Sequence, residues 1–269
     1  MNIEYSKITL KSDYILDNYN FLGSTIRGVF GIGLKKIVCI NPSKICEGCF
    51  AKDSCLYYDF FESDFAKFRL SIELGGKLNF DIFLFEEYAL KAPYVISAIY
   101  KAFREIGVTK KRIKPEFMLY FNDELIYDNE FLSFENKSLI YEINDYKKDV
   151  IVFFKTPLRI KENNKFVRDK VKFETILRSI NHRYSKLKNQ PIEKLPFLPK
   201  YEIEFENYSF VELKRFSNRQ KSAMKFGGLT GVMSIKNIDE QTYKYLKIGE
   251  LIGVGKQVTF GLGKIELKE

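Results

Sequence analysis

A glycine-rich stretch near the carboxyl end of the chain has the composition of a phosphate-binding loop. Residues 253–264 share this character through four glycines, two lysines and one aromatic residue: Gly253, Gly255, Gly261, Gly263, Lys256, Lys264 and Phe260. Glycine lets a backbone approach a phosphate closely, and N–H and ammonium groups supply the attraction. The same spacing also occurs where a helix ends and a tight turn leads into a strand. Taken alone, the stretch leaves both interpretations open.

His182 is the only histidine, which excludes metal sites and catalytic triads that need two. At about 100° per residue on a helix, it lies opposite an apolar stripe and shares a face with Arg178 and Ser185. A surface or capping histidine is the ordinary interpretation. However, an imidazole that titrates near neutrality, beside cations able to hold a phosphate, suits acid–base attack on RNA.

A second cationic segment, residues 214–221, has four cations in eight residues and no acid. Its polar candidates for RNA contact are Lys214, Arg215, Ser217, Arg219 and Gln220. Unbalanced like charges repel across a turn, whereas contacts with phosphates and base edges need such side chains. An aromatic such as Phe260 is able to stack a base, although most of the aromatic residues must build the core.

All four cysteines lie within seventeen residues, as Cys39, Cys46, Cys49 and Cys55. Two disulfides are not expected in a cytosolic protein, and four thiolates with a central C-x2-C are able to close around one structural zinc ion. An iron–sulfur cluster and reduced, unliganded thiols are the alternatives. With no open coordination position and no nearby histidine, a metal here would stabilise a loop and take no part in catalysis.

Composition and charge indicate a globular, cytoplasmic protein with a polyanionic partner. No apolar run approaches the length that spans a bilayer, and residues 1–5 lack the features of a secretion signal. The net charge is +9, and residues 151–200 alone hold 13 basic and 4 acidic side chains. A phosphate-tracking surface needs such a concentration of charge, whereas a solvated face mixes the signs.

The elements that must position these residues follow one order twice. Strand 3–10, helix 20–38, a hairpin of strands 68–74 and 78–84, helix 89–106 and strands over 116–127 form the first set. Strand 150–155, helix 173–187, strands 201–213 and 228–236, helix 239–251 and strand 258–267 form the second. Both sets read β-α-β-β-α-β, the ferredoxin-like order.

We therefore predict an α+β protein of two tandem ferredoxin-like, RRM-like domains. The first covers residues 1–146 and carries a four-cysteine insertion at 39–64, and the second covers 147–269 and carries the glycine-rich loop at 253–263.

Several motifs in this order resemble a known family. They are Arg215 to Gln220, Gly227 to Gly231, the glycine-rich loop, Leu22 to Gly28 followed by the cysteines and Tyr57 to Glu62, and the helix from Leu177 to Leu187. Together they are similar to the CRISPR-associated RNA-processing endoribonucleases, family six of the CRISPR-associated proteins within the RAMP superfamily. The similarity covers nearly the whole chain and extends to a cysteine-containing branch.

The resemblance implies that the protein binds and cleaves CRISPR repeat RNA, single-stranded or hairpin, in precursor transcripts to give mature guide RNAs. A ribose 2′-hydroxyl attacks the adjacent phosphate without a catalytic metal, leaving a 2′,3′-cyclic phosphate. Many members use a histidine on the first helix, and the first helix of this chain has none. Our hypothesis is that His182 supplies the acid–base group, with Arg178 or Arg183 holding the phosphate.

Alternatives remain open at this point. Tyr19, Lys35 and Lys36 are the next catalytic candidates, because some family members work without histidine. A non-catalytic RNA-binding subunit of a CRISPR effector complex is the alternative function. Association with such a complex and pairing of two copies are also left open, and no membrane partner is expected.

Overall fold

The computed structural model describes residues 1–17, 19–217 and 222–268, with the side chains of residues 214–224 also outside this description. The chain forms two compact units. One consists of residues 4–70 and 75–140, and the other of residues 1–3, 71–74 and 141–269. Among the described residues, no helix has both the length and the apolar character needed to cross a bilayer.

The amino-terminal unit has the ferredoxin-like order of strands and helices. Its elements are β1 (Asn2–Lys11), α1 (Gly23–Val38), η1 (Lys52–Ser54), α2 (Leu56–Phe61), β2 (Phe68–Ile72), β3 (Phe80–Phe85), η2 (Glu86–Lys91), α3 (Ala92–Tyr100), η3 (Lys101–Ile106), β4 (Met118–Phe121), β5 (Glu124–Asp128), β6 (Glu130–Phe131) and β7 (Leu139–Glu142). The sheet runs β2-β3-β1-β4-β5-β6, and β7 pairs with β1. The first four positions give the antiparallel 2-3-1-4 arrangement that this order of elements produces.

Alternating apolar residues fix the register of this sheet. Ile8 of β1 lies opposite Ile82 of β3 and Phe121 of β4, and all three side chains are buried. A shift of one residue would turn this row toward solvent, so burial specifies the pairing. Phe30 of α1 adds an aromatic contact with Phe68 of β2, whose ring centre is 5.8 Å away.

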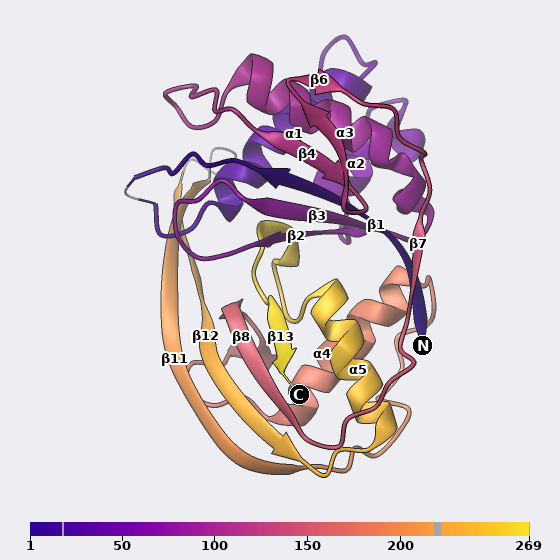
Figure 1. Cartoon of the computed structure of the whole chain (residues 1–269), viewed down its shortest axis with the longest axis vertical. Helices are drawn as coiled ribbons and strands as arrows, with labels where there is room; N and C mark the ends of the chain where they lie inside the picture. Colours follow the sequence, from indigo (N-terminus) through magenta and orange to yellow (C-terminus); the bar gives the residue numbers. More distant parts are fainter. Residues whose placement is uncertain (18, 218–221, 269) are drawn as a thin grey trace. The chain divides into compact units, whose positions relative to one another are not determined.

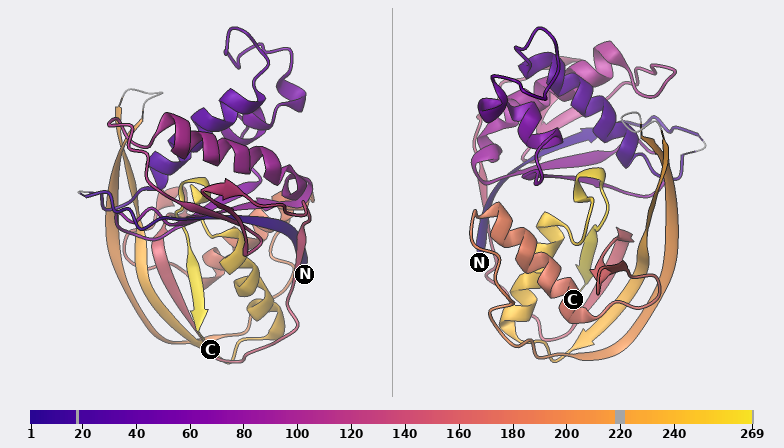
Figure 2. Two further views of the ribbon diagram at one scale, coloured as in Figure 1. Left: turned by 45° about the horizontal axis from the view of Figure 1, so that its top comes forward. Right: turned by 180° about the vertical axis from the view of Figure 1, so that it is seen from behind.

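The carboxy-terminal unit repeats the arrangement with a longer hairpin, β11–β12. Its elements are β8 (Val150–Leu158), β9 (Lys161–Glu162), β10 (Lys165–Phe166), α4 (Phe173–Leu187), β11 (Glu202–Ser217), β12 (Ser222–Lys236), α5 (Glu240–Ile252), η4 (Val258–Phe260) and β13 (Ile265–Lys268). The sheet order is β11-β12-β8-β13. Helices α4 and α5 lie side by side in this unit (Figure 1), and the long β11–β12 ribbon curves along its length (Figure 2).

The predicted fold class, α+β with tandem ferredoxin-like units, is confirmed. Helix α4 has the predicted bounds, because its apolar stripe reports its buried face well. The last strand was predicted too long: it starts at Ile265, after a turn in which Gln257, Gly261 and Gly263 have φ of 64°, 85° and 68°. Positive φ values of this kind are incompatible with an extended strand. The β9–β10 hairpin was not predicted.

Candidate functional site

The glycine-rich loop, residues 253–264, is fastened between helix α4 and the end of strand β8. The backbone N–H of Gly255 donates to Ser179 Oγ on α4 at 2.9 Å. The next N–H, of Lys256, donates to the carbonyl oxygen of Arg159 at 2.8 Å. The structure therefore brings together two features that lie about 75 residues apart in the sequence, the exposed face of α4 and the loop.

The glycines of this loop serve close packing within the protein. A Cβ on Gly255 would lie 2.6 Å from the Arg159 carbonyl oxygen, and φ there is +81°. The N–H groups of Gly253, Val254, Gly261 and Gly263 donate to protein carbonyls, and that of Lys264 donates to the Thr156 hydroxyl. Donors already used in this way do not bind a phosphate. The expectation that these backbone N–H groups form a phosphate-binding cradle is therefore corrected. Side chains of the loop would have to supply the attraction for a phosphate.

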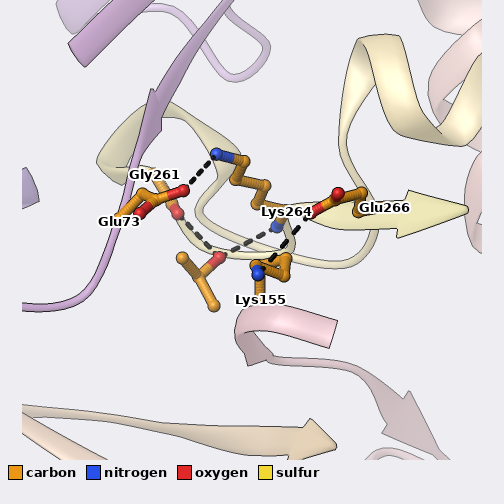
Figure 3. A network of polar contacts seen from close by, with 6 residues as sticks. Glu73, Lys155, Gly261, Lys264 and Glu266 are labelled. Carbon is orange, nitrogen blue, oxygen red and sulfur yellow. Dashed lines mark hydrogen bonds and ion pairs between the residues drawn. The ribbon is translucent and has the colours of Figure 1, made fainter. Parts of the chain in front are cut away.

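The two lysines of the loop have different surroundings. Lys256 is exposed, and the described residues include no ion-pair partner for it. Lys264 Nζ lies 3.3 Å from Glu73 Oε1, beside a second pair between Lys155 and Glu266 at 3.6 Å (Figure 3). Lys256 is therefore the loop cation that is available to a phosphate without exchanging a partner.

Phe260 is half-buried and sets its ring edge-on against Phe226, with ring centres 5.1 Å apart. Because Phe226 belongs to the core, this contact is one that anchors the loop. The structure thus gives the predicted stacking residue a packing role.

His182 lies on the exposed face of α4, as does Arg178. Partial burial lowers the pKa of the His182 imidazole, and the ammonium groups of Lys186 and Lys256 lower it further. Arg178 Nε donates to the carbonyl oxygen of Glu174 on its own helix at 3.2 Å. At neutral pH the imidazole is therefore held in its neutral form, which is the form able to accept a proton.

Two residues near His182 that were expected beside it on the open face or in contact with the phosphate are buried. Arg183 is 7% exposed, and its Nε donates to the carbonyl oxygen of Ile252 at the end of α5, at 2.7 Å. A guanidinium in this place stabilises the carboxyl end of a helix. Ser185 is also 7% exposed and does not share the open face of His182. These positions correct the expected phosphate contact of Arg183.

The segment 214–221 falls largely outside the description. Lys214, Arg215 and Ser217 lie in β11, where their backbones pair with Lys225, Met224 and Ser222 of β12. Arg219 and Gln220 lie outside the described residues. The contacts predicted for these five side chains stay predictions.

The alternative catalytic residues lie in the amino-terminal unit. Tyr19 and Lys36 are exposed. Lys35 Nζ lies 3.4 Å from Cys46 Sγ and 4.7 Å from the centre of the Tyr57 ring. Burial would lower the pKa of Lys35, but Tyr57 and the Cys46 thiol outweigh it and raise that pKa. A raised pKa makes Lys35 a poor general base at neutral pH.

The four cysteines are half-buried, and none forms a disulfide. Within the described ranges, no three His, Cys, Asp or Glu side chains are grouped closely enough to hold one metal ion. The thiols in this arrangement therefore do not form the tetrahedral site expected for zinc or an iron–sulfur cluster, and the structural metal stays a prediction.

Two residues beside the loop, Arg159 and Phe166, were not predicted from the sequence. The guanidinium carbon of Arg159 lies 3.7 Å from the centre of the Phe166 ring. Asn163 and Asn164, between short runs of alternating residues, are the signal that would have predicted the hairpin carrying Phe166.

Comparison with known proteins gives matches over both units. A family model described as CRISPR-associated endoribonuclease Cas6 matches residues 152–265, and a model described as an N-terminal domain matches residues 3–70. An uncharacterized protein of Archaeoglobus fulgidus is 28% identical over 273 residues, covering 92% of each chain.

Solved structures agree in fold. A Cas6 product complex has a TM-score of 0.57 at 12% identity, with 100% of both chains covered. Thermus thermophilus Cas6 has a TM-score of 0.53 at 11% identity, covering 100% of this chain and 99% of that one. A Cas6-related protein of Pyrococcus furiosus has a TM-score of 0.51 at 12% identity, covering 99% of each. The family match includes α4, the glycine-rich loop and most of the second sheet, so this part of the chain is similar to the CRISPR-associated endoribonuclease Cas6 family.

Proposed function

We propose that this protein is an endoribonuclease that cleaves CRISPR repeat RNA in precursor transcripts to give mature guide RNAs. The match of residues 152–265 to the model of the Cas6 endoribonuclease family supports this role. The observation that carries the proposal is the position of His182: an exposed, neutral imidazole on α4, close enough to Lys256 of the glycine-rich loop for the ammonium group to lower its pKa.

The proposed reaction needs no metal. Neutral His182 accepts the proton of a ribose 2′-hydroxyl, whose oxygen then forms a bond to the adjacent phosphorus. The bond from phosphorus to the 5′-oxygen breaks, and the imidazolium returns its proton to that oxygen. Lys256 and Arg178 oppose the charge on the non-bridging phosphate oxygens. The products are a 2′,3′-cyclic phosphate and a 5′-hydroxyl.

A second candidate is an RNA-binding subunit without nuclease activity. It is favoured by one observation, the absence of histidine from α1, whose sequence runs from Gly23 to Val38. Tyr19, Lys35 and Lys36 stay in the proposal as the other catalytic candidates. The association with a CRISPR effector complex and the pairing of two copies stay predictions.

The test is cleavage of a labelled repeat RNA by purified protein in EDTA. We expect a product with a 2′,3′-cyclic phosphate end, formed by the wild type and not by His182→Ala. A repeat RNA with hydrogen in place of the 2′-hydroxyl at the mapped cleavage site is the substrate control, and it should bind but stay intact. RNA retained without any product would favour the binding subunit. Cleavage by His182→Ala within about threefold of wild type would remove His182 from the mechanism, since such a group contributes roughly 100-fold or more.

A further inference from the structure

The hairpin between β8 and α4 stands outside the ferredoxin-like order of elements. Strand β9 pairs antiparallel with β10, so that Phe166 lies opposite Lys161. The turn residues Asn163 and Asn164 have φ of 48° and 62°, as a tight two-residue hairpin turn requires. This short addition to the domain presents an aromatic side chain among cations.

Phe166 and Arg159 form a stacked pair. The guanidinium carbon of Arg159 lies 3.7 Å from the ring centre, and Lys161 Nζ lies 5.0 Å from the same centre. Arg159 and Phe166 are both half-buried, so part of each remains accessible. A guanidinium plane and an aromatic ring are the two protein surfaces on which nucleobases stack.

Arg159 forms hydrogen bonds both to strand β12 and to the glycine-rich loop. Its Nη1 donates to the carbonyl oxygen of Gly227 on β12 at 3.0 Å. Its own carbonyl oxygen accepts the N–H of Lys256 in the glycine-rich loop. Burial lowers the pKa of the Arg159 guanidinium, and the Glu212 carboxylate opposes this shift. Arg159 Nε is buried, and the described residues include no hydrogen-bond partner for it. The stacked pair is therefore tied to the loop that carries the proposed phosphate-binding lysine.

The charges around the hairpin are mainly positive. Lys161, Lys165 and Arg168 are exposed, and Arg168 lies 4.9 Å over the Phe210 ring as a second cation–aromatic pair. The acid of the hairpin, Glu162, accepts the backbone N–H of Lys172 at the start of α4. Aromatic rings interleaved with exposed cations are the pattern of surfaces that bind single-stranded nucleic acid.

We propose that Arg159 and Phe166 form a stacking platform for one unpaired nucleobase of the RNA, with Lys161 beside the phosphate of that nucleotide. This proposal rests on the proposed function, because RNA is its ligand. The competing explanation is that the stacked pair only stabilises the hairpin.

The test measures binding of labelled repeat RNA, with the 2′-hydroxyl removed at the cleavage site if the wild type cuts. Phe166→Leu keeps an apolar side chain against Arg159 and removes the aromatic face. We expect about 5- to 140-fold weaker binding, the range for loss of one stacked base. Phe205→Ala, at an aromatic residue of β11 that is 54% exposed, is the control and should bind as wild type.

Thermal unfolding of both variants separates a loss of stacking from a loss of folding. Phe166→Leu with wild-type binding would overturn the platform. A repeat RNA carrying 5-iodouridine should also form a photo-crosslink within the peptide that contains Phe166. A crosslink found only in other peptides would also contradict the stacking platform.

The outcomes also separate this proposal from the proposed function. If the wild type binds RNA without cutting, and Phe166→Leu weakens binding, the platform stands and the nuclease assignment fails. If the wild type cuts and Phe166→Leu binds normally, the nuclease stands and the platform fails. A wild type that does not bind repeat RNA contradicts both.

Discussion

The two ferredoxin-like units have the same strand order and different net charges. Residues 4–70 and 75–140 contain 18 basic and 18 acidic side chains, whereas residues 1–3, 71–74 and 141–269 contain 26 and 17. In the amino-terminal unit, Lys35 contacts a thiol and a tyrosine ring, while in the carboxy-terminal unit Lys256 is exposed beside an imidazole. The two units share a fold, so the side chains that each unit places on it determine which unit is suited to bind a polyanion.

The largest expected effect tests which unit carries the reaction. His182→Ala should slow single-turnover cleavage at least about 100-fold, because it removes the general base. Lys35→Ala, Lys36→Ala and Tyr19→Phe in the other unit should stay within about threefold of wild type. Rapid-quench rates at saturating protein measure both sets. The reverse pattern would move the active site to the amino-terminal unit.

Gly255 and Gly28 differ in whether the backbone at that position requires glycine. Gly255→Ala should lower the free energy of unfolding by at least about 2 kcal/mol, since it combines positive φ with a clash against the Arg159 carbonyl oxygen. Gly28→Ala on α1 has no atom within 4 Å of the added Cβ and should be neutral or stabilising by about 0.5–1 kcal/mol. Urea denaturation measures both. Equal effects would contradict the packing role given to the loop.

The two lysines of the loop should differ in their contribution to RNA binding. Lys256→Ala should reduce the slope of log affinity against log salt by about one unit, because one phosphate contact is lost. Lys264→Ala should change it less, since Lys264 is paired with Glu73. Binding of labelled RNA over a series of salt concentrations measures both slopes. An unchanged slope for Lys256→Ala would exclude that lysine from the interface.

The smallest effect is a shift of one pKa. The His182 pKa should lie below its ordinary value of 6.5, so general-base activity should rise with pH, with a midpoint below that value. Lys256→Ala removes one neighbouring cation and should raise the pKa, while burial and Lys186 still lower it. NMR titration of the single histidine reports this directly. A midpoint unmoved by Lys256→Ala would separate the imidazole from the loop.

The same pKa has a consequence for folding. Because protonation is harder in the folded state, the unfolded chain binds more protons at this residue as the pH falls through 6.5 toward the lowered value. The contribution of His182 to stability is therefore present above 6.5 and is lost in that window.

The sequence predicts regular elements well where one face is apolar. The bounds of α4 follow from its stripe of buried residues, and the hairpin of β2 and β3 follows from alternation on both sides of Gly75 and Gly76. The helical projection failed for Ser185 because α4 is covered on more than one side. The side chain of Asn181 bonds both to the Glu193 carbonyl oxygen and to the Tyr245 hydroxyl of α5.

The chemistry of the glycine-rich loop was harder to predict. Its composition indicates close backbone approach, but does not reveal which backbone is approached. In the structure the partners of its N–H groups are carbonyl and hydroxyl oxygens of the protein, among them Pro157 and Thr156. Such pairings join residues about 100 positions apart, and no local pattern carries them.

The ion pair of Lys264 with Glu73 implies an exchange reaction when an anion arrives. A phosphate that binds Lys264 displaces the carboxylate of Glu73, which is 74% exposed. Solvent then hydrates the displaced carboxylate. Such a swap releases fewer counterions than the occupation of an unpaired lysine, because the carboxylate regains its own counterion atmosphere. The number of phosphates in contact with the protein would then exceed the number inferred from the salt dependence of binding. Glu73→Gln removes the carboxylate and should bring the two numbers into agreement.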